Sequence, residues 1–348
     1  MKIKIDDHII GKNYPPFIVA EAGINHNGEI NNAFNMIVNA KKSGVDAIKF
    51  QTYKTEEFVD STQSYSYISQ GKEVTESMFE MFKRCEFSPD DWIRIKKKCD
   101  DEKIIFWSTP QNKTDLEFLL KLGIPAIKIG SDDLTNLPLL RDYSDTGLPL
   151  IISSGMADFS EIHTALETIG TIDGYPTVLL VTTSQYPTPP EDVNLKKFTT
   201  LSSSYPDIPL GFSDHTQGNL ASSLAVVFGS CFFEKHFTLD HNMPGPDHWF
   251  SMDISELKNW VESIHTASKM MGENSIKPTL KELEMRKIAR RSITAISDIK
   301  KGDNFNYENL GMRRPGTGLP ASMMDKIINL IASRNIKNGE LIKSGDFE

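Results

Sequence analysis

Short apolar runs rich in valine, isoleucine and phenylalanine alternate along the chain with longer amphipathic segments. The short runs are typical of buried strands, and the amphipathic segments have the spacing of helices that bury one face. We therefore expect eight strands, at residues 17–23, 47–52, 104–109, 126–131, 149–155, 178–183, 209–215 and 231–237. Helical patterns lie at 31–43, after Ser88, and at 113–121, 138–145, 159–169, 217–228 and 255–271.

Strands that alternate with helices predict parallel β/α units, which places the chain in the α/β class. Eight such units over roughly 270 residues match a (β/α)8 TIM barrel in number and length. A doubly wound open sheet is the alternative. That fold normally carries a glycine-rich GxGxxG turn after its first strand, and the sequence has none there. The pattern therefore favours the barrel.

The chain changes character towards its C-terminus. The last part has short apolar runs, turns at 301–303 and 338–339, and one short helical pattern at 323–331. We expect two domains, a TIM-barrel catalytic domain at 1–280 and a small β-rich domain at 281–348. A domain this small builds only a limited core, so we expect it to dock against another surface.

Polar residues gather at the C-terminal ends of the expected strands, which form the active-site face of a barrel. Because alternate strand residues share a face, Lys49 and Gln51 point the same way, and so do Glu234 and His236. The candidate residues at these ends are Glu21, Lys49, Gln51, Thr109, Lys128, Ser131, Ser153, Ser213, His215, Glu234 and His236.

Two of these residues, His215 and His236, end consecutive strands and are therefore expected to converge. A single histidine is more often a polar core residue than a ligand. Two imidazoles at neighbouring strand ends, close to Glu234 and Asp247, favour a divalent transition metal with open positions for substrate and water.

Lys49 and Lys128 lie within apolar runs and, with the serines and threonines at the strand ends, suit a phosphate dianion. An alternative is that Lys49 or Lys128 is a Schiff-base nucleophile, as in barrel aldolases. The histidine pair makes metal-assisted chemistry on a phosphorylated or enol-phosphate substrate the favoured interpretation. A barrel that binds sugar without catalysis is a further alternative.

The net charge of −9 is unevenly distributed. Residues 286–348 carry 12 Lys and Arg against 7 Asp and Glu, whereas the rest of the chain carries 26 against 40. An acidic body is not typical of a nucleic-acid-binding protein, so we expect no nucleic-acid partner. The basic C-terminal part is suited to face an anionic ligand.

The cysteines and the apolar stretches of the chain bear on where the protein is located. The three scattered cysteines, Cys85, Cys99 and Cys231, argue against a disulfide scaffold and for a reducing environment. The chain shows neither a signal-peptide pattern at its start nor an apolar stretch long enough to span a membrane. We therefore expect a cytoplasmic protein without a membrane partner.

Motifs spread over nearly the whole chain resemble those of the sialic acid synthase family. They are AEAGINHNG (20–28), IKFQTY (48–53), FWSTP (106–110), IKIGS (127–131), IISSGM (151–156), QYPTP (185–189), GFSDHT (211–216), EKHFTLD (234–240) and PGPDH (244–248). The C-terminal KKGDNF and RRPGTG motifs resemble the antifreeze-like, or SAF, domain of that family.

The resemblance implies an enzyme that condenses phosphoenolpyruvate with an open-chain N-acyl hexosamine. The product is a nine-carbon 2-keto sugar acid, and phosphate is released. It also implies a domain-swapped homodimer in which the SAF domain caps the partner's active site, with Arg314 reaching the N-acyl sugar. His215 and His236 would hold Mn²⁺, with Mg²⁺ and Co²⁺ as alternatives.

The resemblance also assigns the remaining roles. Catalytic roles fall to Glu21, Lys49, Lys128, Asp133, Glu234 and Asp247, and substrate binding to Gln51, Thr109, Ser131, Ser153, Ser184, Tyr186, Ser213 and Arg314. Asp133 stands where the family often has glutamate, so its carboxylate reaches less far. Phe50 and Tyr53 are more typical of legionaminate-type relatives, so the acceptor is N-acetylmannosamine or a 2,4-diacetamido-trideoxyhexose.

Overall fold

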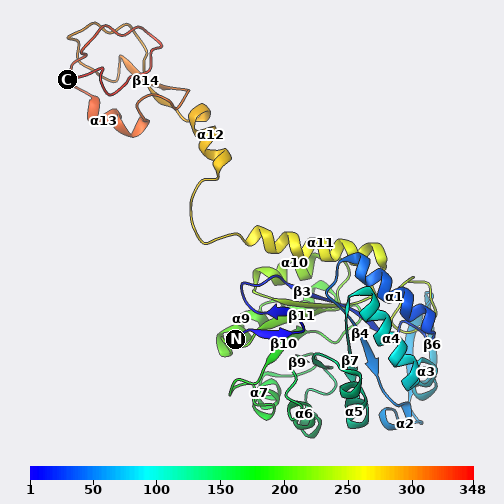
Figure 1. Cartoon of the computed structure of the whole chain (residues 1–348). Helices are drawn as coiled ribbons and strands as arrows, with labels where there is room; N and C mark the ends of the chain where they lie inside the picture. The colour runs from blue at the N-terminus through cyan, green and yellow to red at the C-terminus, as the bar shows by residue number, and fades with distance from the viewer. The chain divides into compact units, whose positions relative to one another are not determined.

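The computed structural model describes residues 1–348, which form two compact units, Met1–Gly272 and Glu273–Glu348. Eight parallel strands of the first unit pair in the order β7-β4-β3-β12-β11-β10-β9-β8, and β7 and β8 lie side by side, so the sheet nearly closes on itself (Figure 1). This arrangement confirms the expected TIM barrel. The strands are β3 (Phe17–Gly23), β4 (Ala47–Thr52), β7 (Ile105–Pro110), β8 (Ile127–Ile129), β9 (Leu150–Ser153), β10 (Thr177–Thr182), β11 (Leu210–Asp214) and β12 (Phe232–His236).

Helices surround the barrel, and each buries an apolar stripe against it. The helix expected after Ser88 begins at Pro89, where the Ser88 hydroxyl accepts a hydrogen bond from the Asp91 amide at 3.2 Å. The longer helices are α1 (Ile30–Ser43), α4 (Pro89–Glu102), α5 (Lys113–Leu122), α6 (Leu137–Ser144), α7 (Phe159–Thr168), α9 (Lys197–Ser204), α10 (Leu220–Val227) and α11 (Ile254–Met271). The eight-residue helix α3 (Met78–Cys85) and two four-residue helices, α2 (Thr55–Phe58) and α8 (Pro190–Val193), accompany them.

The N-terminal end of the barrel is closed by an apolar floor. The rings of Phe17, Trp107 and Phe232 stack on one another with centroids 5.5–5.8 Å apart. A hairpin of β1 (Ile3–Ile5) and β2 (His8–Ile10) packs its isoleucines into the same cluster. Water and polar ligands are therefore excluded from this end of the barrel.

The same two-residue period that builds the floor places polar side chains above it. Phe17 and Val19 point into the barrel, so Glu21 does as well. On β4, Ala47 points inward and is followed on the same face by Lys49. Each strand thus runs from an apolar floor to a polar mouth, and the alternate residues pack outward against the helices.

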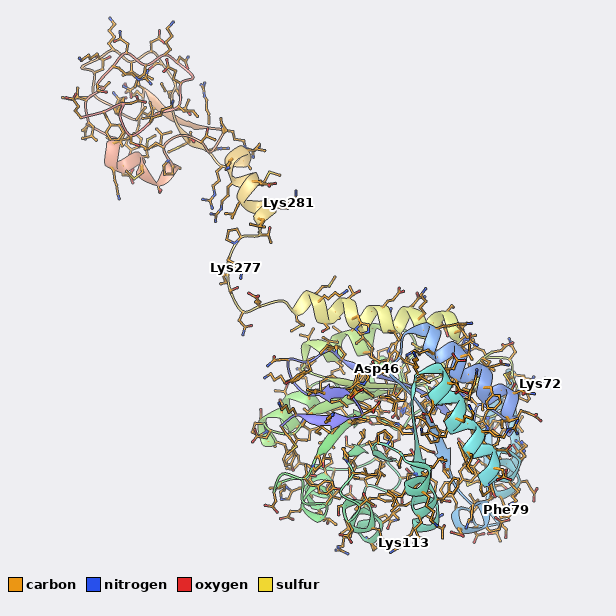
Figure 2. The ribbon with its side chains drawn as sticks, in the orientation of Figure 1. Asp46, Lys72, Phe79, Lys113, Lys277 and Lys281 are labelled. Carbon is orange, nitrogen blue, oxygen red and sulfur yellow. The ribbon has the colours of Figure 1, made fainter.

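The insertion after β4 forms an antiparallel hairpin of β5 (Ser64–Ser69) and β6 (Lys72–Ser77), where the sequence pattern predicts no element. Lys72 at its tip and Lys113 at the start of α5 lie at the periphery of the unit (Figure 2). No helix of the structure is both long and apolar enough to cross a membrane. All three cysteines are free and buried.

The second unit has a core of its own, built around Ile293, Phe305 and Ile336. Its elements are α12 (Leu280–Ala289), β13 (Ser292–Ala295), β14 (Leu310–Arg313), a 3₁₀ turn at Ala321–Met323 and α13 (Met324–Ile327). The helix expected at 323–331 is thus shorter, since the chain beyond Ile327 turns to pair with other segments of the unit. Helix α12 buries no residue within the unit, and the Lys281 side chain is 92% exposed (Figure 2).

Candidate active site

Four buried charged groups from four strands of the barrel, β3, β4, β8 and β12, meet above the floor. Lys49 Nζ lies 2.7 Å from Glu21 Oε2 and 3.8 Å from Glu234 Oε1, and Lys128 Nζ lies 3.7 Å from the same Glu234 oxygen. Burial alone would lower the pKa of Lys49, but Glu21 and Glu234 outweigh it and raise that pKa. Burial lowers the pKa of Lys128 and raises that of Glu21.

Hydroxyl groups surround the two ammonium groups. Lys49 Nζ donates to Thr109 Oγ1 at 3.2 Å, and Lys128 Nζ donates to Ser153 Oγ at 2.8 Å. The Ser131 hydroxyl accepts from the Gly155 amide at 3.0 Å, and a Cβ at Gly155 would collide with the hydroxyls of Ser131 and Ser184. Gln51 Nε2 donates to Glu21 Oε1 at 3.3 Å. The cations and hydroxyl donors predicted for phosphate therefore lie close together.

His215 and His236 lie beside this cluster with ring centroids 5.6 Å apart. His215 Nδ1 donates to the Thr183 carbonyl at 2.8 Å, which leaves Nε2, 3.5 Å from Ser213 Oγ, with its lone pair. His236 Nδ1 is buried without a hydrogen-bond partner. Burial lowers the pKa of both rings, to about 4 for His215, so both are neutral at pH 7. Neutral, incompletely satisfied imidazoles fit a divalent metal.

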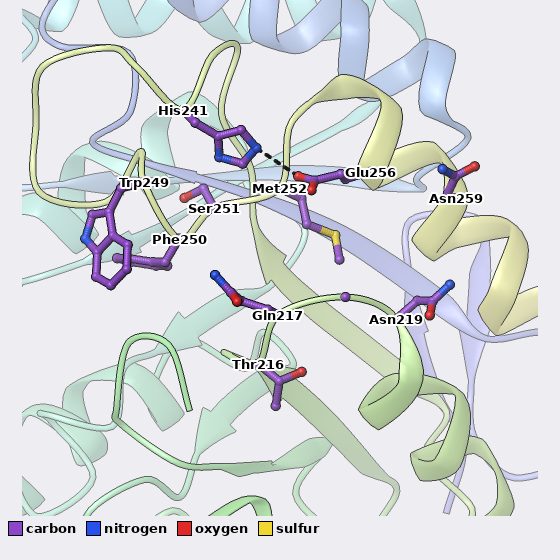
Figure 3. Close-up of a pocket in the computed structure, with 11 residues that line it drawn as sticks. Thr216, Gln217, Asn219, His241, Trp249, Phe250, Ser251, Met252, Glu256 and Asn259 are labelled. Carbon is purple, nitrogen blue, oxygen red and sulfur yellow. Dashed lines mark hydrogen bonds and ion pairs between the residues drawn. The ribbon is translucent and has the colours of Figure 1, made fainter. Parts of the chain in front are cut away.

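A second group that could ligate a metal, which the sequence pattern does not predict, is formed by His241, Asp253 and Glu256. His241 Nε2 lies 3.0 Å from Glu256, and both residues line a cavity of about 380 Å³ together with Trp249 and Phe250 (Figure 3). Asp253 and Glu256 already form the capping box of α11, and all three side chains are at least partly exposed. Their polar atoms are therefore satisfied, unlike His236 Nδ1.

Aromatic rings form one wall of the mouth. The Tyr186 ring centroid lies 4.2 Å from that of His215 and 5.6 Å from that of His236, and Phe250 packs on both Tyr186 and His236 at 5.2 and 5.3 Å. Tyr186 is 44% exposed, so its ring faces the opening. Phe250 was not predicted. Its signal, an aromatic two residues after the PGPDH motif, was too weak to separate from core packing.

Asp247 lies at the same opening, with Oδ2 3.9 Å from His236 Nδ1. Burial, reinforced by the charge of Glu21, raises the pKa of Asp247 to about 7. The loop that carries Asp247 is tied to the barrel by Asn25, whose side chain donates to the Phe237 carbonyl at 2.9 Å and to Ser251 Oγ at 3.0 Å. Hairpin β5–β6 holds the other side, since the Gly245 amide donates to Ser69 Oγ at 3.2 Å.

Two predicted residues do not join this cluster. The Asp133 carboxylate accepts from the Asn136 side chain at 3.0 Å, at the start of α6, and has no contact with either lysine. Of these two adjacent acids it is Asp132 whose charge acts on Lys49 and Lys128, more weakly than the charges of Glu21 and Glu234. Arg314 follows β14 in the second unit, and its role in sugar binding stays a prediction.

Comparison with known proteins shows the family to which the chain belongs. Residues 36–276 match the model of the NeuB family, and residues 290–348 match the SAF domain. The chain belongs to the NeuB family. This NeuB-family chain is 40% identical to an N,N'-diacetyllegionaminic acid synthase of Legionella pneumophila, over 94% of each chain. It is 38% identical to a synthase of the same name from Campylobacter jejuni, over 94% of this chain and 98% of the other.

Among solved structures, the NeuB-family chain resembles an N-acetylneuraminic acid synthetase from Leptospira borgpetersenii, crystallised with citrate. The TM-score is 0.73 at 34% identity, and the match covers 82% of this chain and 95% of the other. The NeuB-family chain is therefore an enzyme, a sugar-acid synthase with a C-terminal SAF domain.

Proposed function

We propose that the enzyme condenses phosphoenolpyruvate with an open-chain 2,4-diacetamido-trideoxyhexose to a nine-carbon 2-keto sugar acid and releases phosphate. The similarity to two synthases of N,N'-diacetyllegionaminic acid supports this acceptor. N-acetylmannosamine is the second candidate acceptor. An acceptor with a 6-phosphate would need a further cationic group at the mouth, because Lys49 and Lys128 are assigned to phosphoenolpyruvate.

The observation that carries the proposal is the pair of buried lysines within a ring of hydroxyls. Phosphoenolpyruvate brings a phosphate and a carboxylate, and Lys49 and Lys128 supply one ammonium group for each. Thr109, Ser153 and the neighbouring hydroxyls donate the remaining hydrogen bonds. The hydrogen bonds and ion pairs of the free protein already fix these side chains in place. They would therefore orient the enol carbon towards the histidines without losing further side-chain freedom when the ligand binds.

The reaction joins C3 of phosphoenolpyruvate to the aldehyde carbon, adds water at C2 and breaks the C2–O bond to phosphate. A divalent ion on His215 and His236 would polarise the aldehyde when bound. Asp247, with a pKa raised to about 7 by burial, is suited to take a proton from the water near neutral pH. Glu234, which lies between the two lysines, keeps both ammonium groups aimed into the mouth.

A Schiff-base aldolase is a second candidate, because burial lowers the pKa of Lys128 and so favours its neutral amine. Borohydride reduction in the presence of phosphoenolpyruvate or pyruvate distinguishes the two. The synthase leaves Lys128 unmodified, whereas an aldolase gives a stable adduct at Lys128 or Lys49.

The direct test is a phosphate-release screen with phosphoenolpyruvate and three acceptors: N-acetylmannosamine, its 6-phosphate and the diacetamido-trideoxyhexose. Release should require the last of these and a divalent ion, and chelation should abolish it. Lys128→Met should lose turnover, whereas Lys281→Met, at a side chain 92% exposed on α12, should not. No release with any acceptor in metal-loaded enzyme would contradict the proposal.

We extend the proposal to assembly and location. A swapped homodimer would let Arg314 and the basic second unit cap the mouth of the partner subunit, where anionic groups are bound. A cytoplasmic location agrees with three free, buried cysteines and with phosphoenolpyruvate as substrate. Analytical ultracentrifugation tests the dimer.

A further inference from the structure

Two buried charged residues have no place in the proposed chemistry. Asp214 directly precedes His215 at the end of β11, and Lys235 directly precedes His236 at the end of β12. The two are opposite each other in the strand register, and Lys235 Nζ lies 3.0 Å from Asp214 Oδ2. Their side chains are 0% and 3% exposed. By the two-residue period they point away from Ser213 and Glu234, into the layer beneath the helices.

Both carboxylate oxygens of Asp214 and the ammonium group of Lys235 have hydrogen-bond partners, which lie in the loop after β11 and in α10. Asp214 Oδ1 accepts from both the amide and the hydroxyl of Thr216 at 2.8 Å, and Oδ2 accepts from Ser222 Oγ of α10 at 2.6 Å. Lys235 Nζ donates to the Thr216 carbonyl at 2.5 Å. Ser222 Oγ in turn accepts from Trp260 Nε1 of α11 at 2.8 Å.

These bonds hold the backbone on both sides of His215, one of the two candidate metal ligands. Asp214 precedes His215 in the chain, and Thr216, which follows it, bonds to both Asp214 and Lys235. Lys235 in turn directly precedes His236. The ends of β11 and β12 therefore cannot slide or twist relative to each other without breaking the ion pair. The same contacts hold the backbone that carries both imidazoles.

Stability alone does not account for such a pair. A buried ion pair loses hydration on both charges, and well-packed apolar residues of similar size are often equally stable or more so. Directional bonds do supply a single fixed geometry, which apolar packing does not. We propose that Asp214 and Lys235 are positioning residues that hold His215 and His236 at the spacing a divalent ion requires. This inference rests on the proposed metal-dependent function.

The test compares Mn²⁺ binding with stability in three variants. Asp214→Leu/Lys235→Met replaces the pair by apolar groups, and Asp214→Asn keeps the acceptor for Thr216 but removes the charge. Ile264→Val, a fully buried side chain of α11, is the control for a small loss of packing in the barrel. Free Mn²⁺ is measured by electron paramagnetic resonance without substrate, and urea unfolding by circular dichroism in chelator.

We expect the double variant to unfold within the range spanned by wild type and Ile264→Val, yet to bind Mn²⁺ at least tenfold more weakly. Asp214→Asn should weaken Mn²⁺ binding at least threefold. If the double variant does not fold, the comparison of Asp214→Asn with wild type decides the question. Wild-type Mn²⁺ affinity in folded variants would overturn the positioning role alone. Wild-type protein that binds no Mn²⁺ would overturn the metal proposal as well.

Discussion

Replacing Lys49 by methionine removes one positive charge from the buried cluster while keeping the length of the side chain. Lys49 Nζ lies 2.7 Å from Glu21 Oε2, and both side chains are less than 5% exposed. At an effective dielectric constant of about 20, that separation corresponds to roughly 6 kcal/mol of Coulomb attraction. Part of it offsets desolvation, so removal of one partner from a buried pair costs about 3–5 kcal/mol. We expect a loss of folding free energy in that range.

The loss should depend on pH through Glu21. Burial already raises the pKa of Glu21, and Lys49 is the main group that lowers it. Without Lys49, the pKa in the folded state rises further above the unfolded value, so the folded protein keeps its proton to higher pH. The variant therefore loses stability relative to wild type as pH rises above about 4.5. Glu21→Gln in the same chain should remove this pH dependence.

Tryptophan fluorescence in urea can follow the barrel alone, because Trp92, Trp107, Trp249 and Trp260 all lie in the first unit. The single variants and the double variant Lys49→Met/Glu21→Gln complete a mutant cycle. We expect the double variant to recover at least about 2 kcal/mol of the summed losses. Additive losses, or a cost below about 1 kcal/mol for Lys49→Met, would show that the pair is not coupled as its geometry indicates.

Three further predictions concern other parts of the molecule. The rate should rise with pH through about 7 as Asp247 ionises, and this inflection should vanish from the pH–rate profile of Asp247→Asn. Arg314→Ala should raise the KM for the sugar far more than that for phosphoenolpyruvate; an equal effect on both would contradict a capping role. Phe305→Ala, in the core of the second unit, should cost that unit about 3–5 kcal/mol and leave the tryptophan-monitored transition of the barrel unchanged.

The barrel could be predicted from sequence because buried parallel strands leave a strong signal. An apolar run that ends in a charged residue, such as the run before Lys49, is typical of the carboxyl end of a parallel strand, and the count of eight β/α units favoured a barrel over an open sheet. Because alternate residues of a strand share a face, Lys49 and Gln51 were predicted to point the same way. The structure agrees, since both side chains contact Glu21.

Other features depended on contacts between distant segments. The hairpin that seals the floor consists of two three-residue strands, too short for a periodic signal. Asp132 and Asp133 are adjacent acids, and only the turn before α6 decides which charge acts on the lysines. The Asp214–Lys235 pair was equally hidden, since sequence alone does not show that two neighbouring strands place opposite charges in register.

The apolar floor of Phe17, Trp107 and Phe232 has a kinetic consequence. Lys49 is opposite Trp107 in the strand register, so its level in the barrel is next to the floor, whereas His215 and Tyr186 pack together at the mouth. Because the barrel is open only at its mouth, the ligand that binds deeper has to bind first and leave last. The proposed function therefore predicts that phosphoenolpyruvate enters before the sugar and that inorganic phosphate leaves after the nine-carbon product. Steady-state inhibition by phosphate should accordingly be competitive towards phosphoenolpyruvate and noncompetitive towards the sugar.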